Sequence, residues 1–464
     1  MNDNLDSNAT KRKRTTKVIV DSPNNLDLDT YIANYKGHTK VDRLLFIAER
    51  CPPLQIEAYR LAVAELKATS LDTAKYSHAV GKLNDALVAR SQPAQPLDSA
   101  WVETTQKKAR AQTEKLEAEL KSYKNNMIKE SIRMGHNDLG DHYYNCGDLP
   151  NALKCYSRTR DYCTTAKHIV DMCLNVIKVS IETSNFAHVQ SYVAKAEGAP
   201  EVQDKSLVQA KLRCASALAM LDTNNQNKYK QAARMLLETS FEIGSNYNEV
   251  ISPNDVAIYG GLCALASFDR AELKKQVIDN AEFKNFLELE PHIRELIHSF
   301  YHSNYKTCLE ILDKSKVRVR VFRAPCHIRP LHSTLLFFRT QNDLLLDLHL
   351  HAHVETLYEN IRKKALVQYF SPFLSVDLNR MAASFSTDVR RLESELAQLI
   401  TDNQIQARID SHNKILCAKQ QDQRSHVFEK SLAVGADYDK ATRALLLRFN
   451  MIKAELVVRP PKEL

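Results

Sequence analysis

Glycine is scarce in this chain, with only 10 among 464 residues. Phosphate-binding loops need closely spaced glycines, and the sequence contains neither GxxxxGK[ST] nor GxGxxG. The hydrolase motif GxSxG and the zinc-protease motif HExxH are missing as well. There is also no apolar run of about 18 residues, the length of a membrane-spanning helix. The sequence therefore gives no support to a nucleotide-binding, hydrolytic or membrane-embedded protein.

Other scarce residues and motifs further limit the class of protein. The scarcity of glycine and proline makes a turn-rich all-β protein an unlikely reading, and the ten cysteines include no CxxC pair. Scattered cysteines are typical core residues of a reducing compartment. The N-terminus is polar and has no apolar signal core, so we expect a protein of the cytoplasm and nucleus. Lys11, Arg12, Lys13 and Arg14 form a candidate nuclear import signal, although a solvated charge run explains them equally well.

What is present is mostly helical periodicity. The predicted fold class is all-α: a right-handed solenoid of helical pairs, then a winged-helix module and a C-terminal bundle helix. The predicted layout is a disordered tail (1–25), N-terminal helices (26–130), a TPR-like helical repeat (131–315), an atypical insertion (316–341), the end of the repeat with a winged helix (342–422), and a linker with the C-terminal helix (423–464).

The repeat assignment depends on one well-defined helical pair. Gly140 and Tyr143 on one helix, and Ala152 and Tyr156 on the next, have the small and large spacing of a tetratricopeptide unit. The small residues let the two helices approach closely, while the tyrosines fill the space beside them. Residues 145–148 supply the turn. Later copies of this pattern are looser, so we expect a helical-pair solenoid and not a regular array.

The winged helix is predicted from residues 361–418. A helix ends at Phe370 before Ser371-Pro372, a second helix follows Ser375, and a third begins at Asp388. The periodicity then changes to two, and a polar turn at 410–414 separates two short strands. Such modules often bind DNA through the third helix. Here that helix carries a net charge of −1, counting Asp388, Arg390, Arg391, Glu393 and Glu395, so a protein partner is favoured over nucleic acid.

Two surfaces are predicted to contact other chains. The first is the strand edge of the hairpin, whose unpaired backbone groups could extend a neighbour's sheet. The second is a helix over residues 438–456 with two apolar stripes, which needs partners on both sides. Its alternative is docking back onto its own domain. The predicted contact residues are Ile405, Ala407, Ile409, Ile415 and Cys417 in the hairpin, and Leu445, Phe449, Ile452 and Leu456 in the helix.

One histidine cluster is a candidate metal site. His349, His351 and His353 contain the HxH start of JAMM-type zinc isopeptidases, which continue with seven residues, Ser, two residues and Asp. Counting from His351, those places hold Glu359 and Arg362; counting from His353, they hold Ile361 and Lys364. Neither register supplies the third oxygen ligand that a hydrolytic zinc requires. We therefore predict no metal site, no cofactor and no catalytic residues.

Several longer blocks resemble the PCI family, whose members form the proteasome lid, the COP9 signalosome and translation initiation factor three. Within that family the chain is most similar to the subunit 1 family of the COP9 signalosome, and less similar to its proteasome lid paralogue. The similarity runs from about Tyr31 to the C-terminal helix, and the insertion at 316–341 departs from it. The blocks that carry it are residues 135–143, 151–158, 257–265, 286–291, 368–372 and 410–416.

The resemblance implies a non-catalytic scaffold subunit of an assembly that removes the ubiquitin-like protein Nedd8 from cullins and so regulates cullin–RING ubiquitin ligases. It also implies that the isopeptidase is a different subunit. In this family the winged helices join edge to edge in an open ring, where subunits 2 and 3 are the expected neighbours, and the C-terminal helices enter a shared bundle. A proteasome lid subunit is the alternative in the same class. A winged-helix nucleic-acid-binding protein is the alternative from another class.

Overall fold

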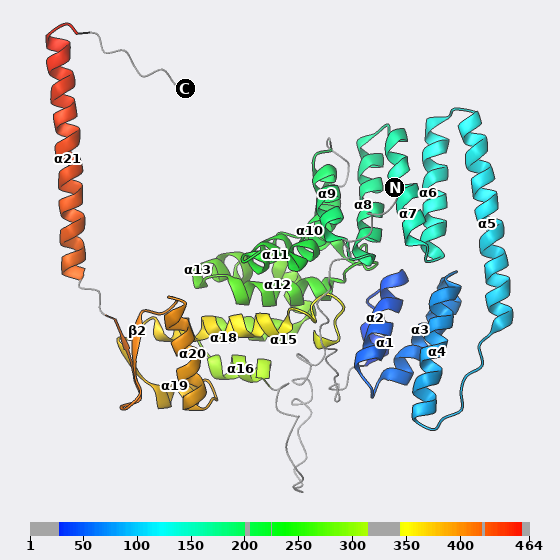
Figure 1. Ribbon diagram of the computed structural model, residues 1–464, viewed down its shortest axis with the longest axis horizontal. Coiled ribbons are helices and arrows are strands. Elements are labelled where there is room, and N and C mark those ends of the chain that lie inside the picture. The colour runs from blue at the N-terminus through cyan, green and yellow to red at the C-terminus, as the bar shows by residue number, and fades with distance from the viewer. Residues whose placement is uncertain (1–26, 200–204, 224, 314–343, 420–422, 457–464) are drawn as a thin grey trace, which may run out of the picture. The chain divides into compact units, whose positions relative to one another are not determined.

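The computed structural model describes residues 27–199, 205–223, 225–313, 344–419 and 423–456 (Figure 1). The chain divides into two units, Met1–Tyr369 and Phe370–Leu464, and each is described by itself. The predicted tail (1–25) with Lys11–Arg14 and the predicted insertion (316–341) lie outside the described residues. No helix among the described residues is long and apolar enough to cross a membrane.

The first unit begins with helices whose ends follow the sequence signals. Asp72 caps α4 by accepting a hydrogen bond from the Lys75 backbone N–H, and Asp98 caps α5 in the same way from Trp101. The last of these helices, α5, buries only Thr105 and Leu120, as its low apolar content indicates. The helices are α1 (Leu28–Ile32), α2 (Gly37–Arg50), α3 (Gln55–Thr69), α4 (Thr73–Ala89) and α5 (Ser99–Asn125).

The repeat that follows packs each helix against the next along the chain. Gly140 on α6 lies against the Tyr156 ring of α7, where an added Cβ would come 2.7 Å from the ring carbon Cε1. The turn between them needs Gly147, whose φ is +80°. The helices are α6 (Lys129–Asn145), α7 (Leu149–Arg158), α8 (Ala166–Glu182), α9 (Phe186–Glu197), α10 (Lys205–Asp222) and α11 (Lys228–Leu237), with a 3₁₀ turn at Thr159–Tyr162 and another at Phe241–Ile243. The predicted helical solenoid is confirmed.

The end of the first unit is organised around α12 (Pro253–Ser267). This helix is apolar on all sides and is covered by α11, α14 and α15. Glycine allows the close contact with α15, because a Cβ on Gly261 would come 2.5 Å from Ile293 Cγ2. The remaining helices are α13 (Arg270–Leu273), a π-helical turn (Lys274–Ile278), α14 (Ala281–Leu289), α15 (Pro291–Tyr301), α16 (Tyr305–Asp313) and α18 (Val354–Phe370).

The second unit contains a winged helix followed by a long helix. Its three-stranded antiparallel sheet has the order β1-β3-β2, with β1 (Ser375–Asp377), β2 (Ala407–Asp410) and β3 (Ile415–Ala418). Val376 and Ile409 both pair with Leu416 of the central strand. Two helices, α19 (Leu378–Ser384) and α20 (Val389–Thr401), provide the core residues Leu378, Met381, Leu392, Leu396 and Leu399. The final helix is α21 (Gln423–Lys453).

The structure corrects the predicted boundaries in this region. Residues after Ser375 first form strand β1, and the helix predicted there begins only at Leu378, where Asp377 caps it. The helix predicted from Ile361 begins earlier, at Val354. The C-terminal helix, expected from Tyr438, begins at Gln423. Its first turns are polar enough to resemble a linker, but Val427 and Val434 continue the apolar stripe at seven-residue steps.

Candidate functional site

The C-terminal helix α21 carries the largest set of exposed apolar side chains in the described residues (Figure 1, red). Three of the four residues predicted there as subunit contacts lie on α21 and are exposed: Leu445 by 68%, Phe449 by 64% and Ile452 by 73%. The fourth, Leu456, is 59% exposed and lies beyond the end of the helix at Lys453, although the helix was predicted to reach it. Exposed apolar surface of this extent marks an interaction site in a soluble protein. Val427, Phe428, Leu432, Val434, Tyr438, Leu446 and Leu447 are exposed as well.

The five predicted contact residues of the hairpin are placed differently. Ile405 and Ala407 are buried within the winged helix, Ile409 and Ile415 are half-buried, and Cys417 is exposed. A charge at Ile405 would therefore disturb the module's own core. The sheet order leaves a free edge on β2 and another on β1, while β3 lies between them. Contact with sister chains at these positions stays a prediction.

A further apolar pair lies beside β1 and was not found from the sequence. Phe373 is 47% exposed and Leu374 is 67% exposed. The Leu374 carbonyl accepts a hydrogen bond from Ala418 at 2.8 Å, so this pair continues the line of the edge strand. The sequence signal is the short apolar run after Ser371-Pro372, a dipeptide that in the sequence marks only the end of a helix. The β1 edge thus has apolar side chains beside its free backbone groups.

The third helix of the winged helix has its charges largely paired. On α20, Arg391 lies 3.1 Å from Glu395, and Glu393 accepts a 2.8 Å contact from Lys414 at the end of the hairpin turn. Such pairs leave few free cations on the face that would meet a phosphate backbone. Hydrogen bonds from the backbone of Asn413, then from its side chain, lower the pKa of Asp410 in the turn. Asp410 thereby fixes the turn and adds a negative charge beside the same face.

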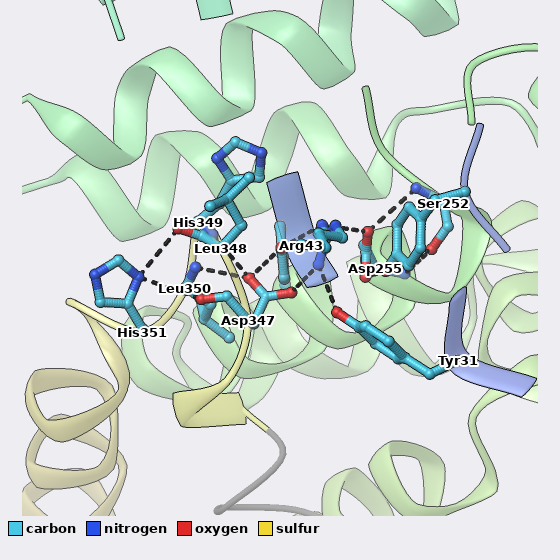
Figure 2. A network of polar contacts seen from close by, with 11 residues as sticks. Tyr31, Arg43, Ser252, Asp255, Asp347, Leu348, His349, Leu350 and His351 are labelled. Carbon is cyan, nitrogen blue, oxygen red and sulfur yellow. Dashed lines mark hydrogen bonds and ion pairs between the residues drawn. The ribbon is translucent and has the colours of Figure 1, made fainter. Parts of the chain in front are cut away.

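The first unit contains a buried ion-pair network that the sequence analysis did not identify (Figure 2). Arg43 is completely buried and lies 2.7 Å from Asp347 Oδ2 and 3.0 Å from Asp255 Oδ2. Its Nη1 donates to the Tyr31 hydroxyl at 2.7 Å. Tyr35 donates to Asp255 at 2.7 Å and its ring lies 4.1 Å below the guanidinium. The network therefore joins α1 and α2 to α12 and to the segment before α18.

The pKa values of the two carboxylates of this network are shifted in opposite directions. Burial raises the pKa of Asp347, but Arg43, His349 and the hydrogen bonds from Tyr259 and Arg43 outweigh it and hold the pKa at about 2. Asp347 also accepts hydrogen bonds from the backbone of His349 and Leu350. Burial dominates at Asp255 and raises its pKa. Asp255 caps α12 through a reciprocal pair of hydrogen bonds with Ser252, so it serves both the helix end and the network.

The three histidines of the tested motif lie next to this network. His349 and His353 have pKa values lowered to about 4, chiefly by burial. The His351 ring lies within hydrogen-bonding distance of the backbone carbonyls of Asp347 and Leu348, and His353 lies 3.4 Å from the Tyr229 hydroxyl. No group of three or more metal-binding side chains occurs among the residues that the structure describes. These contacts assign the histidines to packing and turn formation.

A small cavity of about 100 Å³ lies where the N-terminal helices meet the repeat. It is lined by His38, Tyr144 and Lys178, among others. Lys178 already pairs with Glu249 at 2.6 Å and lies 4.1 Å from the Tyr144 ring centre. Pockets for small-molecule ligands usually have about 300–1,000 Å³. Because the cavity is small and its cation is already paired, we interpret it as a gap in the packing between these helices.

Comparison with known families divides the chain into three consecutive matches. Residues 98–276 match the 26S proteasome subunit RPN7 family. Residues 332–420 match the PCI domain. Residues 423–448 match the family described as the C-terminal helix of COP9 signalosome complex subunit 1, and they correspond to α21.

Individual relatives give the same assignment over nearly the whole chain. COP9 signalosome complex subunit 1 of Arabidopsis thaliana is 52% identical over 95% of this chain and 92% of its own length. The subunit 1b protein of Drosophila melanogaster is 42% identical over 96% of this chain and 88% of its own length. The 26S proteasome non-ATPase regulatory subunit 6 of Caenorhabditis elegans is more distant, at 22% identity over 69% of this chain and 73% of its own length.

Proposed function

Because the chain belongs to the COP9 signalosome complex subunit 1 family, we propose that it is a non-catalytic scaffold subunit of that complex. In this role it supports the removal of Nedd8 from cullins by another subunit and thereby regulates cullin–RING ubiquitin ligases. The observation that carries the proposal is α21. Its apolar side chains are exposed in the isolated chain, although burying such side chains is worth about 1.5–3 kcal/mol each. A helix of this kind is stabilised by neighbours that the described residues of its own unit do not provide.

The proposed neighbours follow from the two exposed features of the second unit. The free edges of β1 and β2 suit sheet extension by the winged helices of subunits 2 and 3. The helix α21 suits a bundle with the C-terminal helices of several subunits. Contact with cullin–RING ligases is proposed only through the assembled complex, and the proposed location is the cytoplasm and nucleus.

The nucleic-acid alternative is weakened by the charges of α20. Affinity for a phosphate backbone comes from a surplus of cations, yet Arg391 and Lys414 each pair with a carboxylate. A gel-shift assay on the full chain, repeated from 50 to 200 mM salt, checks this directly. A tight complex that weakens steeply with salt would favour the nucleic-acid reading.

The proteasome alternative is weakened by sequence identity. The signalosome relative shares 52% of aligned residues, whereas the proteasome relative shares 22%. The two readings predict different companions for the native protein. Mass spectrometry of proteins that co-purify with the full-length chain should therefore find signalosome subunits and not lid subunits.

The scaffold role is tested by reconstitution. The complete set of signalosome subunits is assembled with the full chain, without it, or with a chain lacking residues 423–464. We expect full Nedd8 removal from a neddylated cullin with the intact chain, and reduced incorporation with the truncated chain. Activity of the isolated chain on the neddylated cullin would contradict the non-catalytic assignment. Unchanged assembly of the truncated chain would contradict the role of α21.

A further inference from the structure

The polar residues of α21 indicate the chemistry of the helix that covers it. We infer that the C-terminal half of α21 packs against an acidic amphipathic helix of a sister subunit. This inference rests on the proposed function, because it specifies the partner of the same surface. Two observations carry it: the course of the apolar stripe and the placement of unpaired cations.

The apolar stripe is straight and long. Val427, Val434, Tyr438, Leu445 and Ile452 follow one another at four- and seven-residue steps, and each is at least 61% exposed. At about 1.5 Å per residue the helix is about 46 Å long. A straight stripe with this period matches the ridges of another helix and not the flat surface of a sheet. The expected occupant is therefore a helix that runs along most of α21.

Charge is unevenly distributed along the helix. Residues 440–453 contain Lys440, Arg443, Arg448 and Lys453 but no acidic residue, whereas residues 423–439 contain Glu429, Asp437 and Asp439 together with two cations. Lys440 and Arg443 lie beside Asp437 and Asp439, at 3.9 and 3.1 Å. Arg448 and Lys453 make no ion pair with any described residue. The second half of α21 thus has a surplus of positive charge.

The two unpaired cations flank the apolar stripe. Arg448 lies about 60° to one side of Leu445, and Lys453 lies about 80° to the other side. In paired helices these flanking positions meet charges of the partner and decide which partner is chosen. Carboxylates on the incoming helix would complement both cations. The same pattern disfavours a parallel pair of two copies of this chain, which would bring like charges together.

The experiment compares two double variants of equal charge change in the full chain. R448E/K453E reverses the flanking cations, and K440E/R443E reverses the two on the opposite side of the helix. Each variant is co-assembled with all sister subunits, and incorporation is measured by native mass spectrometry over a salt series. We expect R448E/K453E to weaken incorporation about tenfold or more at low salt, and K440E/R443E to change it less than about twofold. Equal incorporation of the two charge-reversal variants would overturn the inference.

These outcomes are separable from failure of the proposed function. If removal of residues 423–464 leaves assembly intact, the bundle role itself is wrong. If that truncation blocks assembly but R448E/K453E assembles as well as K440E/R443E, only the partner chemistry is wrong. Sedimentation of the isolated chain gives the remaining result, because a stable dimer of the isolated chain would identify a second copy as the occupant and overturn the inference.

Discussion

Two helices of this protein, α12 and α21, are both rich in apolar residues but have opposite surroundings. On α12, Val256, Leu262 and Leu265 are at most 1% exposed, and helices from both sides of the sequence cover them. On α21, Leu445, Leu446 and Leu447 are 56–68% exposed. An apolar helix is stable in water only when its faces are covered. Other helices of its own unit cover α12, whereas the described residues of the second unit leave the apolar side chains of α21 exposed.

The difference separates a helix that stabilises the fold of its own unit from a helix whose apolar surface is available to another chain. Around α12 the contacts are completed by a charged group, because Asp255 at its start holds Arg43 of a distant helix. Around α21 the charged groups flank the apolar stripe and two of them have no ion-pair partner among the described residues. The first helix is the centre of a folding unit, and the second is half of an interface.

The largest expected effect comes from placing the same charge in both helices. Leu262→Asp buries a carboxylate in the core, so we expect a loss of about 5 kcal/mol or more, which prevents stable folding of the first unit. Leu445→Asp should change the free energy of unfolding of the isolated chain by less than about 0.5 kcal/mol, because the side chain is exposed. Urea denaturation of both variants measures this, and similar losses would invalidate the comparison.

The Arg43 network should give the next largest effect. Arg43→Ala leaves Asp255 and Asp347 buried without their cation, which costs about 3–5 kcal/mol. Lys40→Ala is the matched control on the same helix, since its pair with Glu65 is partly exposed and should be worth less than about 1 kcal/mol. The denaturant concentrations at the midpoints of unfolding measure the loss of stability in each variant. Equal losses of stability in the two variants would show that the buried network stabilises the fold around α12 no more than a partly exposed ion pair does.

Replacing a glycine by alanine should act in opposite directions on the two helices. At Gly261 the new Cβ would come 2.5 Å from Ile293 Cγ2, so Gly261→Ala should destabilise the first unit by about 1–3 kcal/mol. At Gly435 there is space, and Gly435→Ala should stabilise the helix by about 0.5–1 kcal/mol. Thermal melts followed by circular dichroism should show both signs. A helix-stabilising effect at Gly261 would contradict the packing described for α12.

Acid should produce an effect no larger than that at Gly261, and only in the packed unit. His136 on α6 is buried, and burial, with Lys124 and Arg158, lowers its pKa to about 4. The unfolded chain takes up this proton first, so the stability contribution is full above about pH 6.5 and is lost as the pH falls towards 4. His136→Gln should therefore remove about 1–3 kcal/mol of the acid-induced loss. A pH series of urea melts compares the variant with the wild type, and identical pH profiles would rule out the assignment.

Local periodicity predicted the helices that depend on neighbours in sequence. Gly140 and Tyr156 are 16 residues apart, and the pattern that identified them describes the contact that the structure contains. The apolar face of α20 was equally readable, because Leu392, Leu396 and Leu399 repeat with the helical period. The same periodicity identified the exposed apolar positions of the C-terminal helix, and their contact role stays a prediction.

Features that depend on distant residues escaped prediction. Arg43 resembles any surface cation of an amphipathic helix, and its partners lie 212 and 304 residues away. Strand β1 has only three residues, too few for an alternating pattern, and exists because β3 pairs with it. Burial of Ile405 likewise depends on how the sheet meets its own helices. Alternation along a strand identifies one face, but it does not say which molecule covers that face.

The span of the Arg43–Asp347 contact has a consequence for synthesis. At about 5–20 residues per second, a ribosome needs about 15–60 s to add the 304 residues that separate this arginine from its aspartate. During that interval the amino-terminal helices are already outside the exit tunnel with an uncompensated guanidinium. Nascent chains of this protein thus pass through a stage in which water, and not Asp347, solvates Arg43, and in which α2 cannot yet be joined to the segment before α18.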